Sequence, residues 1–153
     1  KKVDTPLLDG VLSVNEKQPE ELVKLIVESA SSGSKVAVLG AAFKPGTDDI
    51  RESPTLRIIP RLLELGYRVS LHDPVAIDEA KLVFGETIDY EPNLDSAICG
   101  ADVIALVTSW PEYKSLHKHG NAATIKVVDG RRFLNPEKFE NYRGIGYPKD
   151  IAK

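Results

Sequence analysis

Residues 36–54 read VAVLGAAFKPGTDDIRESP, and this stretch decides the fold. It begins within KVAVLG (35–40), an almost continuous apolar run closed by a glycine, which is typical of a short strand buried in a parallel sheet. In dinucleotide-binding folds such a strand feeds through a tight Gly-rich turn directly into a helix. Here a longer charged loop delays the helix. That loop carries Phe43, Lys44, Thr47, Asp48, Asp49 and Arg51.

Strands and helices alternate along the rest of the chain. A helix is predicted at 53–66, with Ser53 as N-cap, Pro54 in the first turn and Gly66 as C-cap, and Pro60 is expected to kink it. Further strands are predicted at 67–74, 101–108, 124–130 and 143–148, and helices or helical turns at 77–85, 93–100, 111–120 and 135–142. This alternation predicts an α/β fold with a doubly wound, mostly parallel, Rossmann-like sheet in a three-layer α/β/α arrangement.

An N-terminal helical arm is predicted at residues 5–31. Apolar residues recur at helical spacing in 7–14 and again in 22–29, and Pro19 between the two sets predicts a kink or a restart. The run SSGS (31–34) ends the arm. Because the chain contains no Met and starts with KKVDTP, we expect a piece of a longer protein, whose other part covers the apolar stripe of the arm.

Composition narrows the function. The chain has 153 residues, enough for one domain with a real core, and its net charge of -3 argues against a nucleic-acid-binding surface. No apolar run is long enough to span a membrane, and no signal peptide is visible. The single cysteine, Cys99, excludes an intramolecular disulfide and a cysteine zinc site. We interpret it as a small buried hydrophobic residue rather than a nucleophile, in a reducing compartment.

Four polar segments follow the predicted strands. Ligands bind at the carboxyl ends of the strands in an open parallel sheet, so these segments are expected to share one edge. They are the charged loop, His72-Asp73-Pro74, Thr108-Ser109-Trp110 and Asp129-Gly130-Arg131-Arg132. They bring Lys44, Arg51, Arg131 and Arg132 together on an acidic protein, which predicts a site for a phosphate or carboxylate ligand.

The charged loop does not match G-x-G-x-x-G, so the usual dinucleotide fingerprint is absent from it. Two interpretations stay open for Lys44 and Arg51. Either they reach ligand oxygens, with the guanidinium suited to bidentate contact, or Asp48 and Asp49 tie the loop together by pairing with Arg51. In the DGRR turn we favour a ligand role for at least one arginine over two solvated side chains.

The remaining polar candidates are weaker. Trp110 is interpreted as a cover for the core rather than a platform for a base. His72 and Asp73 are a candidate acid/base pair, but successive strand residues point to opposite faces and need not cooperate. His117 and His119 lie two residues apart on a predicted helix and do not face each other, so no metal site is expected there.

LGAAFKPGTDDIRESP (39–54) resembles the signature that opens the C-terminal domain of the UDP-glucose/GDP-mannose dehydrogenase family. HDPVA (72–76), VTSWPEY (107–113) and VVDGRR (127–132) resemble further motifs of that domain in the same order. SVNEKQPEELV (13–23) resembles a V-N-x-x-Q run in the long helix that enters it. The resemblance spans nearly the whole chain.

This resemblance implies an enzyme that oxidises the C6 hydroxyl of a nucleotide sugar twice and uses two NAD. An N-terminal domain would hold NAD, and a central domain would supply the nucleophilic cysteine and drive dimerisation. Residues 1–33 would be the end of the linking central-domain helix, and 34–153 the domain that binds the nucleotide sugar. Both the family's G-x-G-x-x-G and its cysteine motif are absent here, so the chain alone is expected to be inactive, with no catalytic residue; Cys99 does not inherit that role.

The resemblance also implies roles for individual residues. Lys44, Phe43 and Arg131 would bind the substrate, and Arg51 would reach the NAD of the facing domain. The DGRR and TSW segments favour UDP-glucose over GDP-mannose or a UDP-N-acetylhexosamine. We expect a homo-oligomeric cytoplasmic parent with no nucleic acid or membrane partner.

Two other hypotheses stay open. The first is a stand-alone nucleotide-binding module with no enzyme around it. The second is a flavodoxin-like interaction domain, which would bind no nucleotide and would tolerate changes at Lys44 or Arg131.

Overall fold

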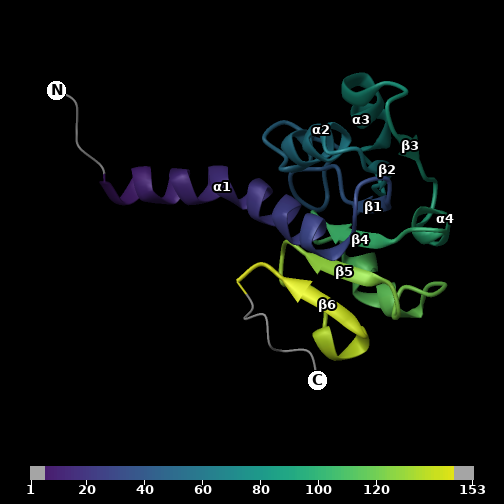
Figure 1. Cartoon of the computed structure of the whole chain (residues 1–153). Coiled ribbons are helices and arrows are strands. Elements are labelled where there is room, and N and C mark those ends of the chain that lie inside the picture. Colours follow the sequence, from purple (N-terminus) through teal and green to yellow (C-terminus); the bar gives the residue numbers. More distant parts are fainter. Residues whose placement is uncertain (1–5, 147–153) are drawn as a thin grey trace.

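The computed structural model describes residues 6–146, with side chains described from residue 17 onward. Its centre is a six-stranded sheet in the order β3-β2-β1-β4-β5-β6, in which all neighbouring strands pair in parallel (Figure 1). The strands are β1 Lys35–Leu39, β2 Arg68–His72, β3 Asp89–Tyr90, β4 Val103–Leu106, β5 Lys126–Asp129 and β6 Asn141–Gly144. Because the order reverses between β1 and β4, the sheet is doubly wound, as the sequence predicts.

Helices cover both faces of the sheet. They are α1 Pro6–Ser29, α2 Thr55–Glu64, α3 Ile77–Phe84 and α4 Leu94–Ile98, with 3-10 helices η1 Pro111–Lys118 and η2 Pro136–Lys138. Helix α1 packs against α2 and against strands β4 and β5. Alternate side chains of β2 reach the other face, where Ser70 Oγ donates to the Ala97 carbonyl of α4 at 3.2 Å and His72 contacts Tyr113 of η1.

Helix α1 is continuous through Pro19, so the predicted restart is wrong. The ring removes one backbone hydrogen bond, but the following turns are held by burial of Leu22, Val23 and Ile26 against the sheet. Figure 1 shows the N-terminal half of α1 extending away from the sheet. The apolar stripe predicted in residues 7–14 lies outside the residues whose side chains are described.

Helix α2 begins at Thr55, two residues later than predicted. Ser53 is buried, and its Oγ accepts from the Thr55 amide at 3.3 Å, which is the kind of bond that its predicted N-cap role requires. The helix continues through Pro60 to Glu64, and the Pro60 ring is exposed. Gly66 follows the helix with φ +82°, which agrees with its predicted place at the C-terminal end.

Short elements account for the other differences. Strand β3 is not predicted, because two residues paired with Ser70 and Leu71 leave no alternating pattern to detect. Strand β6 begins at Asn141 rather than at residue 143, since Asn141 and Tyr142 already pair with β5, and residues 147–148 of the prediction lie outside the described part. Residues 111–118 form a 3-10 helix.

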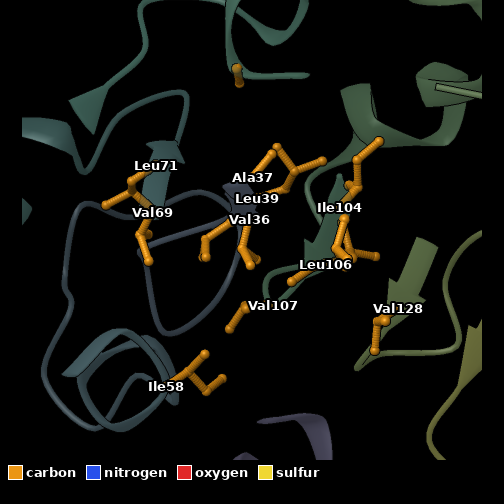
Figure 2. Close-up of a cluster of buried hydrophobic side chains, with 14 of the residues drawn as sticks. Val36, Ala37, Leu39, Ile58, Val69, Leu71, Ile104, Leu106, Val107 and Val128 are labelled. Atoms are coloured by element: carbon orange, nitrogen blue, oxygen red, sulfur yellow. The ribbon is translucent and has the colours of Figure 1, made fainter. Parts of the chain in front are cut away.

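The core is built from strand residues on both faces of the sheet, since successive residues of β1, β2, β4 and β5 are buried. Figure 2 shows part of this core, with side chains from β1, β2, β4 and β5 and Ile58 of α2, and all of those labelled are buried. Cys99 is the exception among the apolar predictions: it follows α4 at the surface and is exposed, so its predicted burial is wrong. The packed strands hold the loops at their carboxyl ends in fixed positions.

Candidate functional site

The four polar segments do share one edge of the sheet. Each follows the carboxyl end of β1, β2, β4 or β5, and all four strands run in parallel. The sheet order reverses between β1 and β4, so the segments surround the switch point, where open α/β sheets bind ligands. The predicted gathering of Lys44, Arg51, Arg131 and Arg132 on one edge is therefore confirmed at the level of the strands that carry them.

Gly40 begins the charged loop in a conformation that favours glycine, with φ +106°. A Cβ at this position would lie 2.4 Å from the Cβ of Thr108, the second residue after β4. The close approach is held by hydrogen bonds on both sides. Thr55 Oγ1 donates to the Gly40 carbonyl at 2.8 Å, and Thr108 Oγ1 donates to the Ala42 carbonyl at 2.6 Å.

Asp73 is a buried structural carboxylate rather than an acid or base. Its Oδ2 accepts from the amides of Ala41 at 2.7 Å and Ala42 at 3.0 Å, and from the Trp110 indole at 3.0 Å. Its Oδ1 accepts from the amides of Val75 and Ala76. The sequence alone does not predict this role. The signal that it offers is a single Asp directly after a predicted strand, at the edge where the charged loop also lies.

Phe43 and Lys44 leave the loop toward solvent. The Phe43 amide donates to the Asp49 carbonyl at 2.8 Å, which closes the loop behind these two side chains. Phe43 is nevertheless 48% exposed, and Lys44 is exposed as well. An exposed aromatic beside an exposed cation, on a backbone fixed from behind, forms a surface suited to a ligand that has both apolar and anionic parts.

Arg51 pairs with Asp49 in a bidentate arrangement. Its Nε donates to Oδ1 at 2.9 Å and its Nη2 to Oδ2 at 2.8 Å. These bonds, with the Arg51 amide and a smaller contribution from the Lys44 charge, lower the pKa of Asp49 to about 2. The internal tie considered from the sequence therefore exists through Asp49, yet the Arg51 side chain stays 86% exposed and remains open to an anion.

The DGRR turn separates its two arginines. Arg132 has φ +52° and donates from Nε to the Ile145 carbonyl and from Nη2 to the Gly146 carbonyl, so it holds the turn to the segment after β6. Arg131 instead lies beside the end of β4, where its Nε donates to the Val107 carbonyl at 2.6 Å. Partial burial lowers the pKa of Arg131, and the charge of Asp129 opposes that shift. Arg131 is thus the arginine of this turn placed at the switch point.

Asp129 fixes the turn that carries Arg131. It is fully buried, and its Oδ1 accepts from the Arg131 amide at 2.7 Å. Its Oδ2 accepts from the amides of Phe133 and Leu134 and from the Tyr142 hydroxyl, at 2.8 to 2.9 Å. Gly130 packs closely here, since a Cβ would lie 2.9 Å from the Leu106 carbonyl oxygen and 3.3 Å from the Leu22 side chain of α1.

His72 and Asp73 do not cooperate, as alternation along the strand predicts. His72 is buried on the other face, with Nδ1 2.9 Å from the Tyr113 hydroxyl and Nε2 4.0 Å from Glu112. Burial lowers the pKa of His72, against the opposing charges of Asp73 and Glu91. The interpretation of Trp110 as part of the core is confirmed, because it is buried and its indole is used by Asp73.

The buried imidazole predicts a pH effect on stability. Because the pKa of His72 in the folded chain lies below its ordinary 6.5, the unfolded chain binds the extra proton first, and the free energy of unfolding should fall as the pH drops below about 6.5. We expect urea titrations at pH 7.5, 6.5 and 5.5 to show this loss, by at most about 1.4 kcal/mol per pH unit. His72→Gln should flatten the dependence, and an equal slope in that variant would contradict the assignment.

Other features do not join the site. Among the side chains described, those of residues 17–146, no cluster of His, Cys, Asp and Glu has the arrangement of a metal site, and His119 contacts Asp95 at 3.1 Å. A hollow lies at the β3 edge of the sheet, away from the switch point, between the end of α3 and the residues of β3. No helix in the described part combines the length and apolar character that crossing a membrane requires.

Residues 37–136 match the sequence model of the UDP-glucose/GDP-mannose dehydrogenase family, UDP binding domain. The chain is 36% identical over 151 residues to the UDP-glucose 6-dehydrogenase TuaD of Bacillus subtilis, which covers 93% of this chain and 33% of the relative. It is 38% identical over 141 residues to the UDP-glucose 6-dehydrogenase AglM of Haloferax volcanii, covering 91% of this chain and 33% of the relative. The chain spans about a third of the length of these curated relatives.

Solved structures give the same picture. A UDP-glucose dehydrogenase from Pyrobaculum islandicum superposes with a TM-score of 0.82 at 36% identity, over 92% of this chain and 32% of that one. A GDP-mannose dehydrogenase from Pseudomonas aeruginosa, solved as a ternary complex, superposes with a TM-score of 0.76 at 25% identity, over 95% of this chain and 35% of that one.

Proposed function

Because the chain belongs to the UDP-glucose/GDP-mannose dehydrogenase family, in its UDP binding domain, we propose that it binds a UDP-sugar at the carboxyl edge of its sheet. One observation carries the proposal. Phe43, Lys44 and Arg131 lie at the switch point, and buried carboxylates hold the backbone beside each of them. The backbone is ordered in advance, so the free energy of binding is not spent on ordering these loops.

Each residue has a role that suits its exposure. The guanidinium of Arg131 would contact the diphosphate, since the bond from its Nε to the Val107 carbonyl holds it beside the end of β4 and a planar guanidinium suits phosphate oxygens. The ammonium of Lys44 would contact a phosphate or sugar oxygen. The ring of Phe43 would cover the apolar side of the ligand, which would give its exposed surface a partner.

Arg51 is proposed to face a second ligand, the NAD held by another domain of the whole enzyme. Its pairing with Asp49 supports this role, because the pair fixes the direction of an otherwise exposed side chain. The guanidinium has five donor hydrogens, and the pair with Asp49 leaves some of them free for a pyrophosphate oxygen. The Asp49 carboxylate would orient Arg51 rather than neutralise the site.

The whole protein is proposed to be an NAD-dependent UDP-glucose 6-dehydrogenase that oxidises its substrate in two steps to UDP-glucuronate. Residues 1–33 would be the end of its linking helix and 34–153 its substrate domain, with the catalytic residues elsewhere in a homo-oligomeric, cytoplasmic enzyme. The exposed thiol of Cys99 suits a reducing compartment. UDP-glucose is preferred to GDP-mannose because the relatives named for it are more similar in sequence.

Calorimetric titration of the 153-residue chain with UDP, UDP-glucose and GDP tests the proposal. We expect the uridine ligands to bind in preference to GDP, and Lys44→Ala and Arg131→Ala each to weaken binding by roughly 10-fold or more, the value of one charge-assisted hydrogen bond. Lys81→Ala and Arg61→Ala are matched controls, since both side chains form surface ion pairs on helices away from the switch point.

The titration has two results that would contradict the proposal. One is the absence of any uridine binding by a chain that is folded at the temperature of the titration. The other is binding that survives both Lys44→Ala and Arg131→Ala.

A further inference from the structure

Asp73 joins three of the four segments at the carboxyl edge. It lies at the end of β2, and it accepts hydrogen bonds from the loop after β1, from its own loop and from the indole that follows β4. Both carboxylate oxygens are occupied by N–H donors, and the residue is only 4% exposed. Its charge is thus used inside the protein and does not face a ligand.

The amides that Asp73 holds are those of Ala41 and Ala42, the two residues before Phe43 and Lys44. Consecutive Cα atoms lie about 3.8 Å apart, so fixing two successive amides fixes where the chain leaves for the next two residues. The Ala42 carbonyl is held as well, by Thr108 Oγ1. Little freedom remains in the backbone that presents the Phe43 and Lys44 side chains, although the side chains themselves project outward.

Successive backbone amides at the end of the first strand are the groups that bind phosphate in a dinucleotide fold. In this chain those amides point at a carboxylate of the protein itself. The carboxylate therefore takes the position of an anionic ligand in the first turn, and a longer loop can extend beyond it.

We propose that Asp73 is a positioning residue for ligand binding, which acts through Lys44 and Phe43 by replacing a bound phosphate with an internal carboxylate. The inference rests on the proposed function for its effect on affinity, while its effect on the loop is independent of any ligand. Trp110 assists it, because its indole shares Oδ2 with the two alanine amides.

Amide hydrogen exchange in the 153-residue chain tests the positioning directly. Asp73→Asn offers one acceptor oxygen where two are needed, so we expect exchange at Ala41 and Ala42 to accelerate at least 10-fold while amides at the centre of β4 change much less. Trp110→Phe removes a single donor, and it should act in the same direction with a smaller effect. Asp102→Asn is the matched control. Asp102 also accepts a hydrogen bond from a backbone amide, that of Lys35, but at the amino ends of the strands.

A double-mutant cycle with Lys44→Ala then separates positioning from general stability. Each single variant should weaken UDP-glucose binding by about 10-fold, and the double variant should lose clearly less than the product of the two losses, because the Lys44 contact is already absent and only the positioning of Phe43 remains to be lost. Trp110→Phe replaces Asp73→Asn in the cycle if the latter does not fold. Two results would overturn the inference. One is a double variant whose loss of affinity equals the product of the two single losses. The other is an increase in exchange rate at Ala41 and Ala42 that is no larger than the increase in β4, in both Asp73→Asn and Trp110→Phe.

The two proposals fail in different ways. If the wild-type chain binds no uridine ligand, the proposed function fails, and the exchange experiment still decides the role of Asp73. If UDP-glucose binds and depends on Lys44 and Arg131 but not on Asp73, the function stands and the positioning role is wrong.

Discussion

Gly40→Ala is expected to destabilise the domain by roughly 2–5 kcal/mol, as the sum of a left-handed backbone cost and an overlap in a packed region. The backbone at Gly40 has φ +106°, and a new Cβ would lie 2.4 Å from the Thr108 Cβ and 2.6 Å from its amide nitrogen. A backbone atom cannot move aside as the end of a flexible side chain can. Urea denaturation of the purified chain would measure the change.

Gly33→Ala is the control for this prediction. Gly33 has a similar φ of +89°, but nothing lies within 4 Å of a Cβ built there. It should show only the conformational cost, about 1–2 kcal/mol. The difference between the two variants isolates the contact between the charged loop and Thr108, and equal losses would mean that this contact is not tight.

Asp129→Ala is expected to cost about 3–5 kcal/mol and to abolish measurable UDP binding, because four donors lose a buried charged acceptor. The donors are the amides of Arg131, Phe133 and Leu134 and the hydroxyl of Tyr142. The turn that carries Arg131 would then lose its fixed shape. Denaturation gives the first effect, and calorimetric titration at a temperature where the variant is folded gives the second.

Tyr142→Phe supplies the comparison, since it removes one hydroxyl from the group and leaves the three amides in place. It should cost about 1 kcal/mol and leave UDP binding near the wild-type value. If Asp129→Ala bound UDP normally while folded, the position of Arg131 would not depend on this carboxylate, and the proposed role of the turn would need revision.

The sequence predicts the layers and the ligand edge because both follow from local patterns. Buried apolar runs such as 35–40 identify parallel strands, and parallel strands place the residues that follow them on one edge. The pattern does not predict what Asp73 and Asp129 do there. Asp73 meets Ala41 and Trp110 across separations of 32 and 37 residues, and such contacts leave no periodic signal.

The individual errors have similar physical origins. A proline inside a helix usually kinks or ends it. At Pro19 the burial of the following turns keeps α1 continuous. Cys99 sits among apolar residues in the sequence, but α4 ends beside it and turns it outward. In both cases the tertiary position, rather than the neighbouring residues in the chain, decides the outcome.

The attachment of α1 has a mechanical consequence. The last turns of α1 are attached to the sheet in three ways. Leu22 and Ile26 are buried in the core, and Lys126 Nζ donates to the Ser29 carbonyl oxygen at 2.6 Å. Arg143 also forms an ion pair with Glu28. A 24-residue helix is about 36 Å long, so a rotation of about 5° at the sheet would sweep its far end by about 3 Å. Because the Leu22 side chain of α1 packs against Gly130, a tilt of α1 would be passed on to the turn that carries Arg131.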